Sequence, residues 1–157
     1  MRALPGKTGK EKALVLIPLV FIVDRLLKIS VLSYLKEGES LPVWPGVFHL
    51  TRVDNTGAAF GLWQGATGLL AAFSAVSAGL IIAYLCGVSG RRPSHPIAWA
   101  FVAGGALGNL YDRLYFGHVI DYLDWRIWPV FNLADICISL GIAWILFRHL
   151  HVPRSLQ

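Results

Sequence analysis

The sequence predicts an all-α membrane protein, built as a four-transmembrane-helix bundle with a small β-rich cradle between the first and second spans. Three observations support this fold class. The 157-residue chain is 55% hydrophobic and only 15% charged, whereas a soluble domain carries about 25% charged residues. Four segments approach the length of about 20 apolar residues that a helix needs to cross a bilayer. The Lys and Arg residues gather at one side of these segments. The length allows one domain over residues 1–157.

The four spans differ in the polar residues that they carry. They cover about residues 13–35, 66–87, 96–116 and 130–150. The second span has no charged residue, and the polar or charged residues that matter in the other three are Asp24, Arg25, Lys28, Asn109, Asp112, Arg113, Asn132 and Asp135.

Basic residues predict how the chain is oriented. If it crosses four times, eight of them share one side: Arg2, Lys7, Lys10, Lys12, Arg91, Arg92, Arg148 and Arg154. The opposite side carries three basic residues that five acids offset. The positive-inside rule therefore predicts cytoplasmic termini and a cytoplasmic loop at residues 90–94.

The two outer loops have different characters. The first, residues 36–65, contains a loosely alternating stretch at residues 47–51, which indicates a short strand or hairpin lying on the membrane surface. The second, residues 117–129, holds Trp125 and Trp128. Tryptophans at such positions are typical interfacial anchors.

Two aspartates near the outer membrane face are the candidates for chemistry. Asp121 lies in the second outer loop, and Asp135 lies just inside the fourth span. A carboxylate inside a bilayer is costly, so an acid there is a functional candidate. Two acids that a helical hairpin brings together suggest a shared proton, as in an aspartic protease.

Other polar residues converge on the same membrane face. Asn109 and Asp112 are three residues apart and share a helix face near the outer end of the third span. Asn132 and Asp135 have the same spacing at the outer start of the fourth. Lys28 lies toward the outer half of the first span. This face is where a substrate could enter from the lipid.

Several of these residues also have a purely structural interpretation. Asn132 and Asp135 have the spacing of a helix-capping box. Asp24 and Lys28 are four residues apart, and we favour a structural ion pair for them. Gly104 and Gly108 form a GxxxG pattern, which more often serves close helix packing than catalysis.

Composition and spacing weigh against other classes of function. The basic residues lie in short flanks of apolar runs, which argues against a nucleic-acid partner. The two cysteines and five scattered histidines lack metal-ligand spacing, so we expect no metal site. A proton-coupled transporter would use the acids as a relay, but no inverted repeat is visible. An assembly factor held together by GxxxG would leave the acids unexplained.

Five segments together resemble one family, the bacterial lipoprotein signal peptidases (signal peptidase II), through nearly the whole chain. Residues 55–61 read NTGAAFG, similar to NxGAAFG, and residues 104–113 read GGALGNLYDR, similar to GGxxGNxxDR. Residues 117–122 read GHVIDY, similar to GxVxDF with Tyr for Phe, and residues 131–135 read FNLAD, similar to FNxAD. Residues 24–28 read DRLLK, similar to DQxxK.

The resemblance implies an intramembrane aspartic endopeptidase of the bacterial inner membrane, with its active site at the outer leaflet. Its substrates would be diacylglyceryl-modified prolipoproteins, cut just before the lipidated cysteine. It would need no cofactor, act as a monomer and be inhibited by globomycin-like cyclic peptides. The catalytic acids would be Asp121 and Asp135, and the substrate-binding or supporting residues would be Asn55, Gly57, Asn109, Asp112, Arg113, Asn132 and Ala134.

Two features depart from the family pattern. Arg25 stands where Gln is common, which leaves the role of the Asp24 region open. The stretch between Asp121 and Asp135 is short, which leaves the shape of the second outer loop open.

Overall fold

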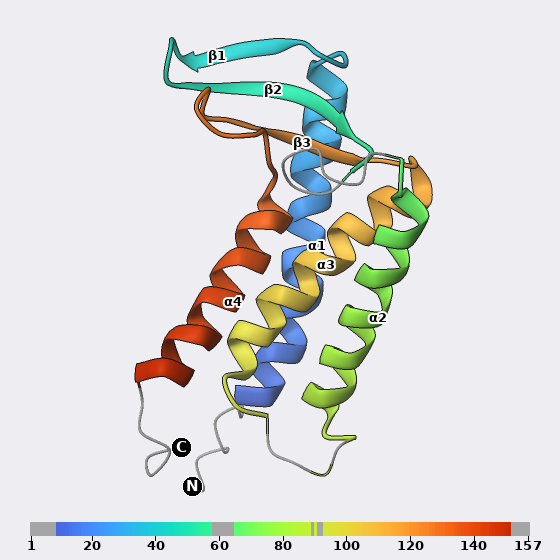
Figure 1. The fold of residues 1–157 in the computed structure, drawn as a ribbon, viewed down its shortest axis with the longest axis vertical. Coiled ribbons are helices and arrows are strands. Elements are labelled where there is room, and N and C mark those ends of the chain that lie inside the picture. The colour runs from blue at the N-terminus through green and yellow to red at the C-terminus, as the bar shows by residue number, and fades with distance from the viewer. Residues whose placement is uncertain (1–8, 58–64, 89, 91–92, 152–157) are drawn as a thin grey trace, which may run out of the picture.

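The structure, a computed structural model, describes residues 9–57, 65–88, 90 and 93–151. In this part of the chain four helices stand side by side, and a small sheet covers one end of them (Figure 1). The start of α1 and the end of α4 lie at the opposite end. In chain order the elements are α1 Gly9–Tyr34, β1 Ser40–Trp44, β2 Phe48–Asn55, α2 Thr67–Cys86, α3 Pro96–Tyr115, β3 Val119–Asp124 and α4 Leu133–His151.

The predicted helices are confirmed with small shifts at their ends. At the end of the bundle next to the sheet, the largest shift is in α4, which begins at Leu133 and not near residue 130. The reason is that Phe131 is still extended: it forms an antiparallel bridge with Leu123, at the end of β3. Among the described residues, α2 and α4 are the two helices long and apolar enough to cross a membrane.

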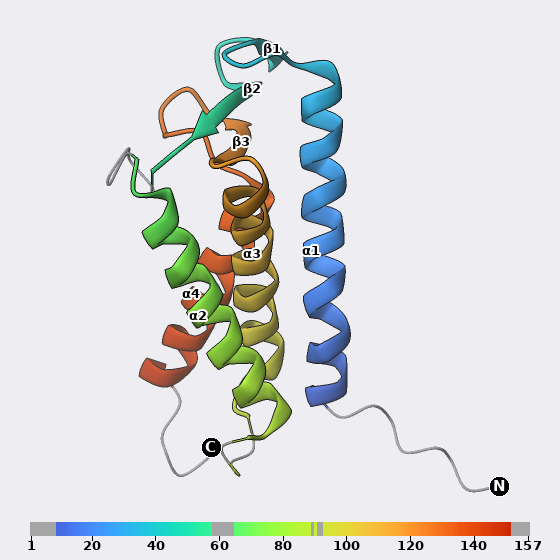
Figure 2. The same ribbon diagram turned by 90° about the vertical axis from the view of Figure 1, so that its right-hand side faces the viewer.

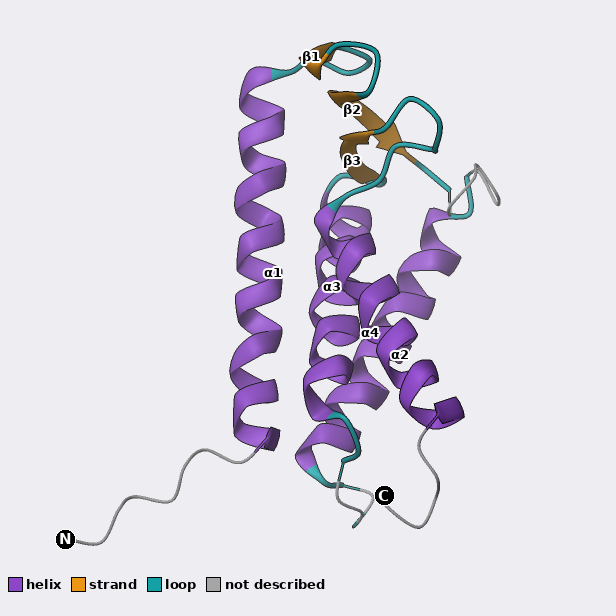
Figure 3. Cartoon of the chain, turned by 90° about the vertical axis from the view of Figure 1, so that its left-hand side faces the viewer, coloured by secondary structure: helices purple, strands orange, loops and turns teal. Residues whose placement is uncertain are grey.

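The predicted hairpin of the first outer loop is confirmed, but the sheet is larger than the sequence indicated. It is antiparallel with the order β1-β2-β3, so the second outer loop contributes the third strand. Figure 3 shows the strands gathered at one end of the helices. The pairing of Val53 with Asp121 places the candidate acid in a strand and not in an irregular loop.

Helix α3 is the centre of the bundle and packs against the other three helices (Figure 2). Its glycines permit this close packing, as the GxxxG pattern predicted. A Cβ atom at Gly104 would lie 2.7 Å from Cβ of Val20 on α1, and one at Gly105 would lie 2.5 Å from the carbonyl oxygen of Ala134 on α4. A larger residue at either position would push a neighbouring helix away.

Candidate active site

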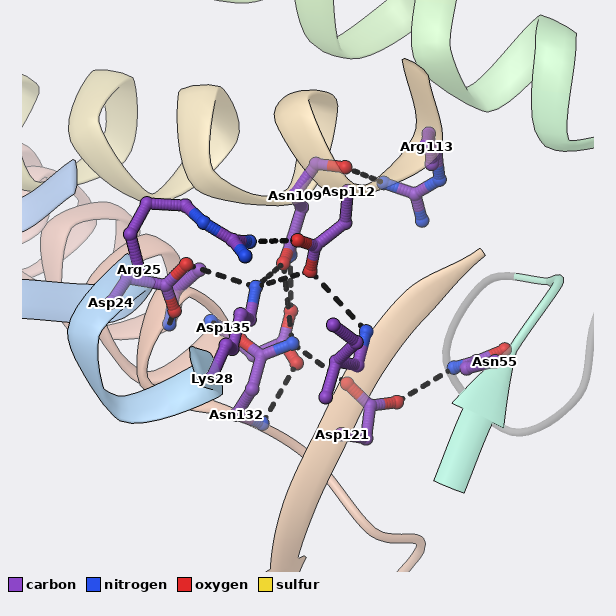
Figure 4. A network of polar contacts seen from close by, with 12 residues as sticks. Asp24, Arg25, Lys28, Asn55, Asn109, Asp112, Arg113, Asp121, Asn132 and Asp135 are labelled. Carbon is purple, nitrogen blue, oxygen red and sulfur yellow. Dashed lines mark hydrogen bonds and ion pairs between the residues drawn. The ribbon is translucent and has the colours of Figure 1, made fainter. Parts of the chain in front are cut away.

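The candidate site lies beneath the sheet, where α1, α3, α4, β2 and β3 meet (Figure 4). Asp121 is on β3 and is 2% exposed. Asp135 is in the first turn of α4. The structure therefore brings the two predicted acids to one place, although different kinds of element carry them.

Each oxygen of the two carboxyl groups accepts a hydrogen bond from nitrogen. Asp121 accepts from the side-chain amides of Asn132, at 2.7 Å, and Asn55, at 2.9 Å. Asp135 accepts from the side-chain amide of Asn109, at 2.8 Å, and from the backbone N–H of Asn132, at 3.2 Å. Asn132 thus contacts both acids. Hydrogen bonds of this kind stabilise the charged form of a carboxyl group.

The capping interpretation of residues 132–135 is also confirmed. The Asp135 backbone N–H donates to Oδ1 of Asn132 at 3.0 Å, while the Asn132 backbone N–H donates to the Asp135 carboxyl group. This reciprocal pair is a capping box. The N–H of Ala134 is bound as well, by Oδ1 of Asp24 at 3.1 Å. This arrangement confirms the structural interpretation, and the functional interpretation of the same residues stays a prediction.

A cluster of buried charges lies behind the acids. The Lys28 ammonium group is 2.9 Å from Oδ2 of Asp24 and 2.7 Å from Oδ2 of Asp112. It also donates to Oδ1 of Asn109 at 3.0 Å. The guanidinium of Arg25 pairs with the other oxygen of Asp112. With two carboxylates and two cations, the cluster has no net charge, which limits the cost of burying it.

The expected ion pair of Asp24 and Lys28 is therefore confirmed as part of a larger cluster. The Asp112 carboxyl group is fully buried and also accepts from the backbone N–H of Ile120, at 3.2 Å. Asp112 thus connects α1, α3 and the start of β3. The Arg25 guanidinium lies over the ring of Tyr111, 4.5 Å from its centroid.

Arg113, near the end of α3, and Gly57, just after β2, also join the site. Arg113 donates to the carbonyl oxygen of Gly57 at 3.3 Å, and the Gly57 N–H donates to Oδ1 of Asn55 at 2.9 Å. The remaining motif residues Ala58, Ala59, Phe60 and Gly61 lie outside the described residues.

A cavity of about 750 Å³ opens beside the two acids. Its polar lining includes Asn55, Asn109, Arg113 and both aspartates. Its apolar lining is formed by Val53, Val119, Trp128, Pro129, Val130, Phe131, Ile136, Ile138 and Leu140. The cavity therefore combines polar groups around the acids with a mainly apolar lining. No group of three His, Cys, Asp or Glu residues that could hold a metal ion occurs in the described ranges.

Burial changes the proton affinity of Asp121. It raises the pKa of this carboxyl group from 3.8 to about 7, and the nearby charge of Asp135 acts in the same direction. Hydrogen bonds from Asn55 and Asn132 oppose the increase. Two carboxyl groups that share a site cannot both ionise cheaply. The pair is therefore able to hold one proton near neutral pH.

Comparisons with known proteins show the family to which the chain belongs. Residues 16–151 match the family described as signal peptidase (SPase) II. The chain belongs to the signal peptidase II family. The lipoprotein signal peptidase of Moorella thermoacetica is 46% identical over 144 residues, which cover 92% of this chain and 95% of that protein. That of Halothermothrix orenii is 40% identical over 132 residues, covering 84% and 90%.

A solved structure confirms the fold of this signal peptidase II family member. It is described as a bacterial membrane enzyme and superposes with a TM-score of 0.82 at 24% identity. The superposition covers 93% of this chain and 92% of that one.

Two features of this signal peptidase II site were missed from the sequence. One is β3, which fixes Asp121 against β2; the β-branched Val119 and Ile120 and the aromatic Tyr122 were a weak signal for it. The other is the contact of Lys28 with Asn109. Sequence spacing placed each residue on a helix face but did not show how α1 and α3 are aligned.

The raised pKa of Asp121 predicts how the stability of this signal peptidase II family member depends on pH. The folded carboxyl group binds a proton below pH about 7, whereas the unfolded one does so only below about 3.8. The folded state therefore binds more protons between these values, and the contribution of Asp121 to the free energy of unfolding falls as pH rises from about 4 to 7. In detergent, the melting temperature of Asp121→Asn relative to wild type should rise over this window and level off above it. A difference in melting temperature that does not change with pH would contradict the raised pKa of Asp121.

Proposed function

We propose that the chain is an aspartic endopeptidase that removes signal peptides from prolipoproteins, with Asp121 and Asp135 as its catalytic pair. The observation that carries this proposal is the convergence of two buried acids, hydrogen-bonded through Asn132, on one cavity. Membership of the signal peptidase II family supports the reaction and the substrate class.

The chemistry divides between the two acids. Asp135 lies at the positive end of α4 and acts as the base that takes a proton from water. The resulting hydroxide attacks the scissile carbonyl carbon while Asp121, with a pKa of about 7, gives its proton to the carbonyl oxygen. When the C–N bond breaks, Asp135 passes its proton to the leaving nitrogen. Asp121 recovers a proton from the intermediate, which becomes the carboxyl product.

The substrate carries a diacylglyceryl group on a cysteine, and the cut falls just before that cysteine. The apolar side of the cavity suits a group that stays in contact with lipid. The bond to be cut must lie where the acids can reach it, while the acyl chains remain in apolar surroundings. No cofactor takes part in this reaction. Globomycin-like cyclic peptides would inhibit by occupying the same cavity.

The remaining predicted site residues have supporting roles. Asn55, Asn109 and Asn132 orient the acids, and Arg113 with Gly57 forms the wall that faces the substrate backbone. Asp112 holds the charge cluster to β3 through the N–H of Ile120. Ala134 is fully buried and leaves room for α3 to approach α4.

The enzyme sits in the bacterial inner membrane as a monomer with four spans. Both termini are cytoplasmic, and the sheet and cavity lie at the outer leaflet. Support comes from Lys10, Lys12 and Arg148, which lie at the end of the bundle away from the sheet. The other basic residues of the predicted cytoplasmic side, Arg2, Lys7, Arg91, Arg92 and Arg154, lie outside the described residues.

Replacement of either acid should abolish cleavage. Asp121→Asn and Asp135→Asn keep the size of the side chain but cannot exchange a proton at neutral pH. Turnover of a diacylglyceryl-modified precursor by each purified variant should fall by at least about 10³-fold.

Asp124→Asn is the matched control for these variants. Asp124 is on the same strand as Asp121, but it bonds to Thr51 and Arg126 and does not line the cavity. This variant should keep turnover within about threefold of wild type. Substantial turnover by Asp135→Asn would show that Asp135 only caps α4 and would end the proposal.

Cysteine labelling tests the topology. Single cysteines at Ser40 and Ser94, in a background with Cys86→Ser and Cys137→Ala, lie at opposite ends of the bundle. In intact cells or spheroplasts, a membrane-impermeant maleimide should label the Ser40 position only. Labelling of both positions from the same side would contradict the four-span arrangement.

A further inference from the structure

Three asparagine side chains face the aspartate pair, and each is held in one orientation. A carboxamide has an accepting oxygen and a donating nitrogen, so a donor bound at its oxygen fixes which end points the other way. Oδ1 of Asn55 accepts from the Gly57 N–H at 2.9 Å, and Oδ1 of Asn132 accepts from the Asp135 N–H at 3.0 Å. Both donors belong to the backbone.

The third asparagine is held by a side chain. Oδ1 of Asn109 accepts from the Lys28 ammonium at 3.0 Å. A second contact, from the Asn132 amide nitrogen at 3.2 Å, supports the same orientation. The Asn109 nitrogen must then face Asp135, to which it donates at 2.8 Å. Lys28 is fully buried, and its three N–H donors match three acceptors, on Asp24, Asp112 and Asn109.

We propose that Lys28 is a positioning residue for the reaction: it holds Asn109 so that an N–H and not a carbonyl oxygen faces Asp135. This inference rests on the proposed peptidase function. With Asn109 reversed, its oxygen would lie against a carboxyl oxygen of Asp135, and that contact is favourable only if Asp135 carries the proton. The wrong member of the pair would then be protonated, and no base would be available for water.

The other charged groups around the pair do not share this contact. The titratable residues that face it are Asp24 from α1, Asp112 and Arg113 from α3, Asp54 from β2, and Tyr122 from β3. Within the described part of the chain, Lys28 is the one charged side chain that donates to the side-chain amide of an asparagine bound to an acid of the pair. Its role is therefore separable from a general effect of nearby charge.

A charge-balanced variant isolates this role. Lys28→Met alone would leave a buried carboxylate without a cation, so it is combined with Asp24→Asn. In the double variant Arg25 still pairs with Asp112, the net charge of the cluster stays zero, and the amide oxygen introduced at position 24 can still accept from the Ala134 N–H. Asp24→Asn alone is the control, because it keeps Lys28 on Asn109 while adding one positive charge to the cluster.

The pH–rate profiles of the two variants should separate, because only the double variant should shift upward. In the double variant the acid limb of the kcat profile should shift upward by about one to two pH units, as expected for the loss of one hydrogen bond to a charged group. KM should stay within about twofold of wild type. In Asp24→Asn the acid limb should shift downward or stay in place. If only charge matters, the double variant will match wild type, and the inference is overturned.

A rescue variant and a second measurement distinguish a positioning role of Lys28 from a role in folding. Lys28→Gln with Asp24→Asn retains a neutral donor for Asn109 and should restore part of the wild-type profile. The infrared band of the protonated Asp135 carboxyl group, assigned by its loss in Asp135→Asn and its retention in Asp121→Asn, should also titrate at higher pH in the double variant than in wild type when substrate is absent. If neither double variant melts cooperatively, Lys28 is required for folding and the inference is overturned.

These readouts also separate the inference from the proposed function. If wild-type protein fails to cleave a lipidated precursor, the proposed function is wrong, and the infrared titration alone decides the role of Lys28. If wild type cleaves but the double variant keeps the wild-type profile, only the role of Lys28 is contradicted.

Discussion

Burying carboxyl groups away from water is costly, and in this protein that cost is met by partners from several helices and strands. Asp24, Asp112 and Asp121 are almost completely buried, and each must find cations or N–H donors inside the protein. The three acids and their partners together come from α1, α3, β2, β3 and the start of α4, so these elements have to meet at one point. The helices can approach closely enough because α3 has glycines where it crosses α1 and α4. The polar interior thus fixes how the helices align, in addition to supporting the chemistry.

The same interactions place the pair of acids between two different surroundings. On one side lies a neutral charge cluster, and on the other lies a cavity with an apolar wall. Between them, N–H donors face all four carboxyl oxygens, which favours a negative charge on the pair. Burial and mutual repulsion oppose a second negative charge, and they raise the pKa of Asp121. The balance favours one charge and one proton, which is the state that peptide hydrolysis by two carboxyl groups requires.

Local patterns in the sequence predicted much of this arrangement. Apolar length located the helices, the spacing of Asn132 and Asp135 predicted the capping box, and the spacing of Asp24 and Lys28 predicted their ion pair. Each of these interactions lies within one helix or at its first turn, where spacing determines contact. The third strand and the contact of Lys28 with Asn109 could not be predicted in this way, because they depend on how distant segments align. The capping box also shows that a structural explanation of a residue does not exclude a catalytic one.

We propose that Asp121 and Asp135 act as a single unit that shares one proton. The most direct test compares turnover of a lipidated precursor by Asp121→Asn, Asp135→Asn and the double variant, with thermal melts to confirm folding. Groups that act as one unit are strongly non-additive. The double variant should therefore be no more than about threefold slower than either single variant, although each single change removes almost all activity. If the losses in the two single variants multiply in the double variant, the acids contribute independently and do not act as one unit.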